Sequence, residues 1–335
     1  MMRVTTLKGA SGAGGMVAYY AGLARDHAAR DGQARGPIDY YLDRDEPPGR
    51  WWGRGSGELG LAGEVRAEQL EALLTGSHPG SGRQLGRAFG EKSARAFDAT
   101  FSAPKSVSVL WGVTDHPWVR AELLAAHDTA VTAVLSWFEQ HGAVTRRGKD
   151  GVHQVDTRGV TVALFRQHTS RALDPQLHTH AVVSAKVQDQ SGRWLSLDAR
   201  FLKQQQRSIS YIYAAALRSE VTDRLGLQWS PVVDGHAELT AVPEAVQVKF
   251  SQRAEQVTTK VAELIDRWSA EHGGAEPDAR TVAKLERAAA VTSRPGKEHP
   301  YDAEHLRAEW QTQARSVGFE PASIVIVQPA SPTDA

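Results

Sequence analysis

Two β-rich runs in the middle of the chain constrain the fold more than any other feature. The segments GVTVALFRQ (159–167) and LHTHAVVSAKVQ (177–188) are apolar and rich in β-branched residues, and the polar segment HTSRALDPQ joins them. A medium-length polar connection between two such runs is typical of an antiparallel strand pair. The sequence therefore predicts a sheet in which these strands are neighbours.

The second strand of this pair carries two histidines. His178 and His180 are separated by one residue, and His168 lies just upstream. Alternate side chains of a strand share a face, so His178 and His180 stand side by side and could bind a divalent cation with a third ligand. The chain has no cysteine, which excludes thiolate metal sites, thiol catalysis and disulfides. The simpler alternative is a strand face whose histidines bind nothing.

Composition points to no particular partner. The formal net charge is +0, so any surface that attracts nucleic acid has to arise from local clustering of basic residues. No apolar run approaches the roughly 20 residues of a membrane span, and the amino terminus MMRVTTLKGASGAGG lacks the apolar core of an export signal. We therefore expect a cytoplasmic protein without membrane insertion.

The remaining segments predict a mixed fold with a helical end. MRVTTL and ARAFDATFS read as strands, and three long amphipathic or apolar stretches (64–76, 116–142 and 208–226) read as helices. Asp234-Gly235 is a hairpin signal. From Pro243 the composition changes to long charged helices, and QPASPTDA is a polar tail. We predict a catalytic domain over 1–240, a helical region over 241–325 and a disordered tail over 326–335.

Paired tyrosines near the amino terminus are candidate nucleophiles. Tyr19-Tyr20 and Tyr40-Tyr41 contain most of the tyrosines of the chain. Packing alone accounts for such pairs in most proteins, but a phenolate can also form a covalent phosphodiester that preserves the energy of the broken bond. A metal ion nearby would balance the charge that develops on the phosphate.

Other segments suggest accessory and DNA-binding residues. Asp98 lies on a predicted strand and could orient a metal-bound histidine or accept the tyrosine proton. Lys105, at a predicted helix start, could hold a phosphate oxygen. In GRWWGRG, Trp51 could stack on a base while Arg50 and Arg54 contact the backbone, or the tryptophans could belong to the core.

Together, FDATFSAPKSVS, TSRALDPQLHTH, WWGRGSGELGLAGEV and the tyrosine doublets resemble the TrwC/MobF class of conjugative relaxases in the HUH endonuclease superfamily. The resemblance implies an α+β fold, a two-layer palm with a central antiparallel sheet covered by helices, plus C-terminal helical fingers. It also implies site- and strand-specific nicking at a plasmid origin of transfer. Tyr19 is then the nucleophile that stays attached to the 5′ phosphate, and Tyr40 serves a second transfer, with Tyr20 and Tyr41 as neighbours.

The same resemblance implies further partners. They are a divalent metal (Mg, Mn, Zn or Ni), single-stranded DNA next to a hairpin, accessory relaxosome proteins and a secretion coupling protein, with export alongside the DNA into a recipient cell. Asp98, His178 and His180 match the acidic residue and two of the three metal ligands. At the position of the third histidine this chain has Gln167. We predict that a local bulge brings His168 in instead, with the Gln167 carbonyl oxygen as the alternative.

Three rival functions stay open at this point. A rolling-circle replication or transposition initiator would use the same chemistry at a different DNA site. A DNA-binding accessory module with a structural metal would form no covalent adduct. A metal hydrolase that activates water would not need Tyr19 and would release a free 5′ phosphate.

Overall fold

A five-stranded antiparallel sheet forms the centre of the molecule. The structure is a computed structural model that describes residues 1–8, 48–293, 303–324 and 326. Every pair of neighbouring strands in the sheet is antiparallel, and the strand order is β1-β3-β7-β6-β2. The strands are β1 (Met2–Lys8), β2 (Arg50–Trp52), β3 (Ala94–Ser102), β6 (Val162–Thr169) and β7 (Pro175–Ser184). β7 therefore lies in the middle of the sheet, and its predicted pairing with β6 is confirmed.

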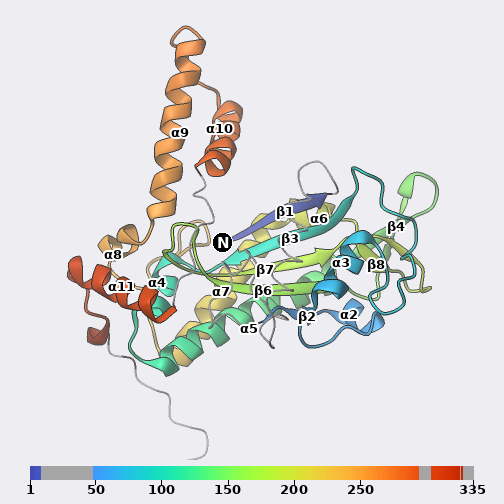
Figure 1. Cartoon of the computed structure of the whole chain (residues 1–335), viewed down its shortest axis with the longest axis horizontal. Coiled ribbons are helices and arrows are strands. Elements are labelled where there is room, and N and C mark those ends of the chain that lie inside the picture. Colours follow the sequence, from blue (N-terminus) through green and yellow to red (C-terminus); the bar gives the residue numbers. More distant parts are fainter. Residues whose placement is uncertain (9–47, 294–302, 325, 327–335) are drawn as a thin grey trace, which may run out of the picture.

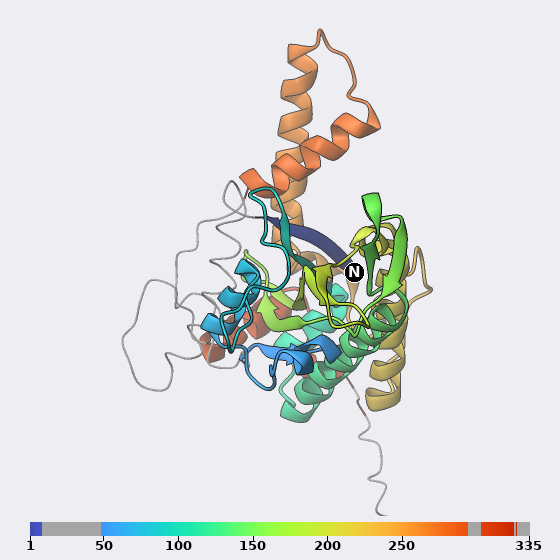
Figure 2. The same cartoon turned by 90° about the vertical axis from the view of Figure 1, so that its right-hand side faces the viewer.

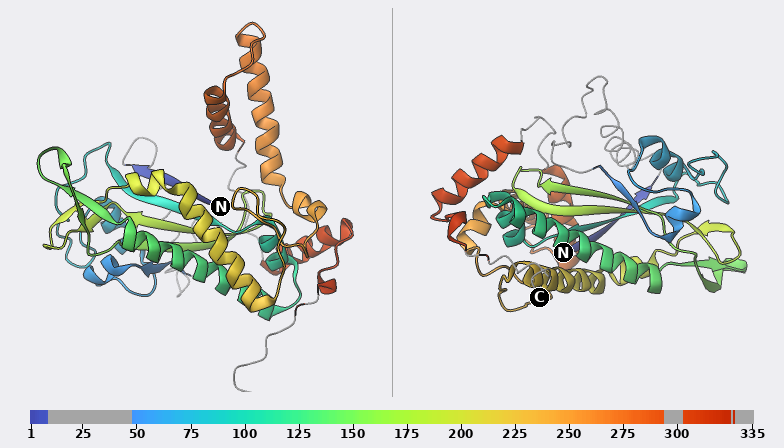
Figure 3. Two further views of the ribbon diagram at one scale, coloured as in Figure 1. Left: turned by 180° about the vertical axis from the view of Figure 1, so that it is seen from behind. Right: turned by 90° about the horizontal axis from the view of Figure 1, so that it is seen from below.

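Helices pack against one face of this sheet and bury the main core. They are α4 (Lys105–Val113), α5 (Pro117–His141) and α7 (Gln206–Leu225), and Figure 3 shows α5 and α7 running side by side along the strands. Apolar side chains from these helices form one cluster with Leu177, Ala181 and Val183 of β7. These β7 residues are two apart or multiples of two because a strand alternates its side chains between faces.

The opposite face of the sheet has a smaller core under a short helix. Helix α3 (Ala67–Thr75) ends at Gly76, which adopts a left-handed conformation with φ of 86° as predicted for a helix stop. Its leucines pack with Val182 of β7 and Phe165 of β6, next to helix α2 (Arg54–Glu58). β7 is thus buried on both sides, which explains the continuous apolar run at residues 181–183 after the histidines.

Two small hairpins extend the molecule beyond the end of the sheet (Figures 1 and 2). One consists of β4 (Val144–Arg147) and β5 (His153–Asp156), with a 3₁₀ turn between them, and the other of β8 (Lys186–Gln188) and β9 (Trp194–Ser196). Helix α6 (Arg200–Gln204) follows. The predicted hairpin at Asp234-Gly235 is present, with φ of 48° and 77° at these two residues.

The C-terminal part is helical, as predicted. It comprises α8 (Glu244–Lys249), α9 (Gln252–Glu271), α10 (Ala279–Thr292), α11 (Ala303–Ser316) and a 3₁₀ turn at Pro321–Ser323. α9 and α10 pack on each other and project away from the sheet (Figure 1). The α+β prediction is confirmed, whereas the boundaries at 240 and 325 remain predictions. None of the helices in the described part of the chain combines the length and the apolar character needed to cross a membrane.

The C-terminal helices are attached to the loop between β6 and β7. The Gln252 side-chain amide at the start of α9 donates to Asp174 Oδ1 at 2.9 Å, and the Trp310 indole of α11 donates to the Leu173 carbonyl at 2.8 Å. Gly112 permits the close approach of α11, because a Cβ at that position would lie 2.9 Å from the Trp310 ring. The loop that leads into β7 is therefore hydrogen-bonded to both α9 and α11.

Two buried histidines make the fold sensitive to acid. Burial is the main cause that lowers the pKa of His127 and of His168 well below 6.5, and the charge of Arg166 adds to it. Below pH 6.5 these imidazoles become protonated in the unfolded chain but stay neutral in the folded protein. The free energy of unfolding is therefore highest above pH 6.5 and decreases as the pH falls. His178, whose pKa is lowered to about 4 mainly by burial, adds a third group of this kind. We expect a loss on the order of 4 kcal/mol per pH unit below 6.5, measured by denaturant unfolding at several pH values.

A matched variant isolates one of the three contributions. His168→Phe keeps an aromatic ring against Trp111 but removes one titrating group, so it should reduce the slope of stability against pH by about a third. A stability that stays flat between pH 6.5 and 5 would contradict this account.

Candidate metal centre

The site is built around two histidines on one face of β7. His178 and His180 have ring centroids 5.2 Å apart, and the rings meet edge to face. In the sheet, Ser102 and Thr100 of β3 lie opposite these two histidines. Asp98 lies further along β3 on the same face, since it is two residues from Thr100. The structure thus brings Asp98, His178 and His180 together, as expected from the sequence.

Hydrogen bonds fix the orientation of both imidazoles. The Nδ1 of His178 donates to the Gln176 carbonyl oxygen at 2.8 Å. The Nδ1 of His180 lies 3.0 Å and 3.1 Å from the two carboxylate oxygens of Asp98. Because both partners are acceptors, Nδ1 carries the proton in each ring, and Nε2 carries the lone pair that can bind a metal.

The protonation state of His178 also suits a ligand. Burial lowers the pKa of His178 to about 4, and the neighbouring His180 lowers it further, whereas the hydrogen bond to Gln176 acts in the opposite direction. The ring is therefore neutral at pH 7, which is the form that coordinates a divalent cation. Asp98 has a buried side chain and contributes its charge behind His180, on the side away from the proposed ligand atom.

The expected third ligand, His168, lies elsewhere. The bulge that our prediction required is present, because the register of β6 and β7 shifts between Gln167 and Thr169. The His168 ring nevertheless stacks on Trp111 of α4, with centroids 4.4 Å apart, in the main core on the other face of the sheet. We correct the prediction accordingly: at this position the alternation of side chains directs His168 away from the histidine pair.

Gln167 instead shares a face with the histidines. It lies directly opposite His178 in the register of β6 and β7, and side chains of such a pair have Cβ atoms roughly 5 Å apart. Within the described residues, no group of three or more His, Cys, Asp or Glu side chains could hold a metal ion. Gln167 is therefore the candidate for a third ligand beside His178 and His180 on this face of the sheet.

Such a donor set fits a divalent metal. Two imidazoles whose rings are fixed by hydrogen bonds, a carboxylate behind one of them and a glutamine on the same face supply nitrogen and oxygen ligands that Zn²⁺, Mn²⁺ and Ni²⁺ accept. The set carries no negative charge of its own in direct contact with the ion, so the ion would keep its attraction for a phosphate. The donor chemistry is thus compatible with the predicted metal.

The four residues expected to contact DNA have different surroundings. Trp51 is only 9% exposed and packs in the smaller core, so base stacking by this side chain is excluded and the core alternative is correct. The Lys105 ammonium donates to the Pro175 carbonyl at 3.0 Å and thereby contacts the start of β7, and its predicted contact with a phosphate stays a prediction. Arg50 and Arg54 are exposed, and each has an acidic partner, Asp128 and Glu139 respectively.

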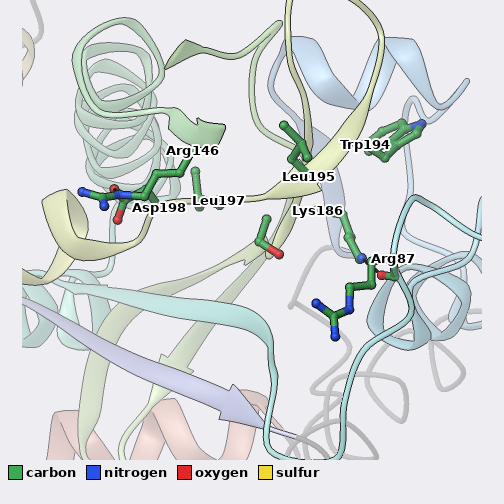
Figure 4. A pocket seen from close by; sticks show the side chains of 8 residues that line it. Arg87, Arg146, Lys186, Trp194, Leu195, Leu197 and Asp198 are labelled. Atoms are coloured by element: carbon green, nitrogen blue, oxygen red, sulfur yellow. Dashed lines mark hydrogen bonds and ion pairs between the residues drawn. The ribbon is translucent and has the colours of Figure 1, made fainter. Parts of the chain in front are cut away.

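A basic pocket at the opposite end of the sheet was not expected from the sequence. It has a volume of about 390 Å³ and lies between β8–β9, β4 and the loop that precedes β3 (Figure 4). Its lining residues are Arg87, Arg146, Lys186, Trp194, Leu195, Ser196, Leu197 and Asp198. Asp198 pairs with Arg146 at 2.8 Å, which leaves the pocket with an excess of positive charge.

The sequence also gave no indication of Thr100, whose hydroxyl lies 3.2 Å from His180 Nδ1. Its spacing of two residues from Asp98 on a strand is the signal that could have revealed it. The predicted catalytic tyrosines, Tyr19 and Tyr40, and their neighbours Tyr20 and Tyr41 lie outside the described residues.

Comparison with known proteins identifies relatives over most of the chain. The profile of the TrwC relaxase family matches residues 13–317. The multifunctional conjugation protein TraI of Escherichia coli strain K12 is 32% identical over 302 residues, which cover 84% of this chain and 16% of TraI. The chain thus spans only a small part of that relative.

Solved structures of TrwC are similar in fold and sequence. The copper-bound complex of the conjugative relaxase TrwC with OriT DNA has a TM-score of 0.74 and 32% identity, and covers 96% of this chain and 100% of that chain. A metal-bound complex with OriT DNA has a TM-score of 0.75 and 31% identity, with the same coverage. TrwC with a 27-mer DNA comprising the recognition hairpin and the cleavage site has a TM-score of 0.73 and 30% identity, again with this coverage.

The identity of the third ligand can be tested with three variants at two adjacent positions. Gln167→Ala removes the amide oxygen on the histidine face and should weaken metal binding, whereas Gln167→His should strengthen it because imidazole is the better ligand. His168→Phe, which keeps the ring against Trp111, should leave the affinity unchanged. Isothermal titration with Mn²⁺ or Zn²⁺ measures all three, and a loss of affinity only in His168→Phe would refute the assignment.

The role of Asp98 can be tested separately. Asp98→Asn removes the charge behind His180 and should weaken metal binding about ten-fold, as is usual when the partner of a metal-bound histidine is changed. Asp189→Asn is the matched control, because Asp189 is a buried carboxylate at the β8–β9 turn whose partners include Ser191 and Arg193. Equal affinities of the two variants would show that Asp98 does not act on the metal site.

Proposed function

Because the chain belongs to the TrwC relaxase family, we propose that it nicks one DNA strand at a plasmid origin of transfer and transfers that strand through a covalent tyrosine intermediate. The observation that carries this proposal is the geometry of β7: two imidazoles share a face, and the Nδ1 of each is held by an acceptor. This arrangement suits the binding of a divalent ion beside a phosphodiester.

In this proposal each residue has a distinct role. His178, His180 and Gln167 would hold the metal, which when bound polarises the scissile phosphate and offsets its developing charge. Asp98 keeps His180 in the tautomer that coordinates through Nε2, so we assign it the orienting role rather than that of proton acceptor. The other role considered for Asp98, acceptance of the tyrosine proton, would weaken this hydrogen bond to His180, because it would remove the negative charge of the carboxylate.

Tyr19 is proposed as the nucleophile. Its phenolate oxygen attacks the scissile phosphorus, the bond to the 3′ oxygen breaks, and the 5′ phosphate stays esterified to the tyrosine. The reverse reaction with another 3′ hydroxyl rejoins the strand. Tyr40 is proposed for the second transfer that ends a round, with Tyr20 and Tyr41 as neighbours of secondary importance. Support comes from the match of this part of the chain to the family profile, which begins at residue 13.

We propose single-stranded DNA next to a hairpin as the substrate. The similar TrwC structures contain OriT DNA, in one case with the recognition hairpin and the cleavage site. Arg50 and Arg54 remain candidates for backbone contacts, and the basic pocket around Arg87 and Lys186 adds another cationic surface. Accessory relaxosome proteins and a secretion coupling protein are further proposed partners of a protein that acts in the cytoplasm and is exported with the DNA.

Covalent attachment provides the decisive test of the nucleophile. The protein incubated with an origin oligonucleotide and Mg²⁺ or Mn²⁺ should form an adduct that resists SDS, and mass spectrometry should locate it on Tyr19. Tyr19→Phe should reduce the adduct by at least about 10³-fold, because it removes the hydroxyl proposed to form the first phosphotyrosyl bond. Tyr40→Phe is the matched control that should still form the first adduct.

Two outcomes would contradict the mechanism. A free 5′ phosphate released by Tyr19→Phe would indicate a hydrolase that uses activated water. Absence of any adduct with intact metal binding would indicate an accessory module whose metal is structural. Comparison of a transfer origin with a replication origin as substrate separates the relaxase from an initiator of rolling-circle replication.

A further inference from the structure

A chain of three buried side chains lies directly beneath the histidine pair, on the other face of β7. Thr179, the residue between His178 and His180, lies 2.8 Å from His127 Nε2 through its hydroxyl oxygen. The Nδ1 of His127 lies 2.8 Å from the hydroxyl of Tyr213. Thr179 is 3% exposed, and His127 and Tyr213 are 0% exposed. The chain thus links β7 to α5 and α7 through the main core.

The surroundings of this chain are apolar. Phe101 of β3 lies opposite Thr179 in the sheet, and its ring centroid is 5.4 Å from that of Tyr213. Leu177 and Ala181, which flank Thr179 on the same face of β7, belong to the buried core. Polar groups in such surroundings weaken a fold unless each one is hydrogen-bonded. Apolar residues would fill this space without that requirement, so packing alone does not explain three polar side chains in series.

The position of Thr179 connects the chain to the metal ligands. Its two peptide groups join it to His178 and to His180, so a rotation of β7 at Thr179 would turn both imidazoles. The hydrogen bond between His127 and the Thr179 hydroxyl opposes that rotation. Metal sites tolerate ligand displacements of only about 0.5 Å and 10–20°. A side chain that fixes the strand between two ligands therefore affects both Nε2 atoms together.

We propose that His127 and Tyr213 are positioning residues for the metal site, which act through Thr179 to hold His178 and His180 in the geometry that binds a divalent cation. The inference rests on the proposed function, since it concerns the same metal site. His127 suits the role because an imidazole has two ring nitrogens on opposite sides, one that donates and one that accepts. It can therefore bridge two hydroxyl groups from different helices and strands, and α5 and α7 support each other along their length.

The test compares two buried threonines. Thr179→Val removes the hydroxyl that His127 contacts and keeps a β-branched side chain. Thr145→Val is the matched control, because Thr145 is also buried and its hydroxyl donates to the Ser196 carbonyl at 2.7 Å, near the basic pocket at the other end of the sheet. Zn²⁺ affinity is measured by competition with a chromophoric chelator at a temperature where circular dichroism shows each variant folded. The double variant His178→Ala/His180→Ala measures the Zn²⁺ binding that comes from all other histidines of the chain.

The proposal predicts that Thr179→Val weakens Zn²⁺ binding about ten-fold, whereas Thr145→Val changes it less than about two-fold. A merely structural role would lower the melting temperature of both variants and leave both affinities unchanged in the folded state. A folded Thr179→Val variant with wild-type affinity would overturn the proposal. If wild-type protein itself bound no Zn²⁺ above the His178→Ala/His180→Ala background, the metal-dependent function would fail first, and this result is distinct from the others.

A second variant keeps the test decisive if Thr179→Val does not fold. Tyr213→Phe removes only a hydroxyl and keeps the ring against Phe101, and it should weaken Zn²⁺ binding in the same direction. In the double variant Thr179→Val/Tyr213→Phe the two losses should not add, because members of one hydrogen-bonded chain act together. Tyr213→Phe with wild-type affinity, or strict additivity in the double variant, would overturn the proposal.

Discussion

The side-chain alternation of β7 is the constraint on which the rest of the structure depends. This strand lies in the middle of the sheet and is packed on both faces, so each residue is committed to one side. His178, His180 and Val182 point to one face, and Leu177, Thr179 and Ala181 point to the other. A shift of one residue would place the histidines in the main core and Thr179 on the metal side. The burial of both faces therefore determines which side chains lie at the candidate metal site as well as which ones pack in each core.

The sequence predicted the parts of the site that depend on local periodicity. The pairing of β6 with β7 and the shared face of His178 and His180 follow from a period of two and from β-branched composition. The helix that ends at Gly76 follows from a glycine stop. The residues that determine these features are close together along the chain. Asp98 lies 82 residues before His180, and its place beside the histidines was expected from the resemblance to the relaxase family.

The wrong predictions share a physical cause. His168 and Trp51 were assigned from their sequence neighbourhood, but the face of the sheet that each side chain takes, and the partners on that face, decide its place. His168 stacks on Trp111 in the main core, and Trp51 packs in the smaller core. The basic pocket escaped prediction for the same reason, since its residues come from separate segments that meet only in the fold. Periodicity assigns a side chain to a face, whereas tertiary contacts decide what that face meets.

Buried polar groups are concentrated around β7, the strand that carries the histidines, and they restrict the positions that this strand can take. At its start β7 follows Asp174, a buried carboxylate that accepts from Gln252 at the base of α9, and the Leu173 carbonyl next to it accepts from Trp310 of α11. At its centre Thr179 contacts His127. Groups of this kind contribute modest net stability, but they permit few alternative arrangements, because any shift leaves a donor or acceptor unpaired. The helices of the C-terminal part and those of the main core thus act on one strand from different directions. Since the loop at Asp174 leads into His178 within four residues, a displacement of α9 at its base would reach His178 and His180, the proposed metal ligands, unless the contact at Thr179 held the strand in place.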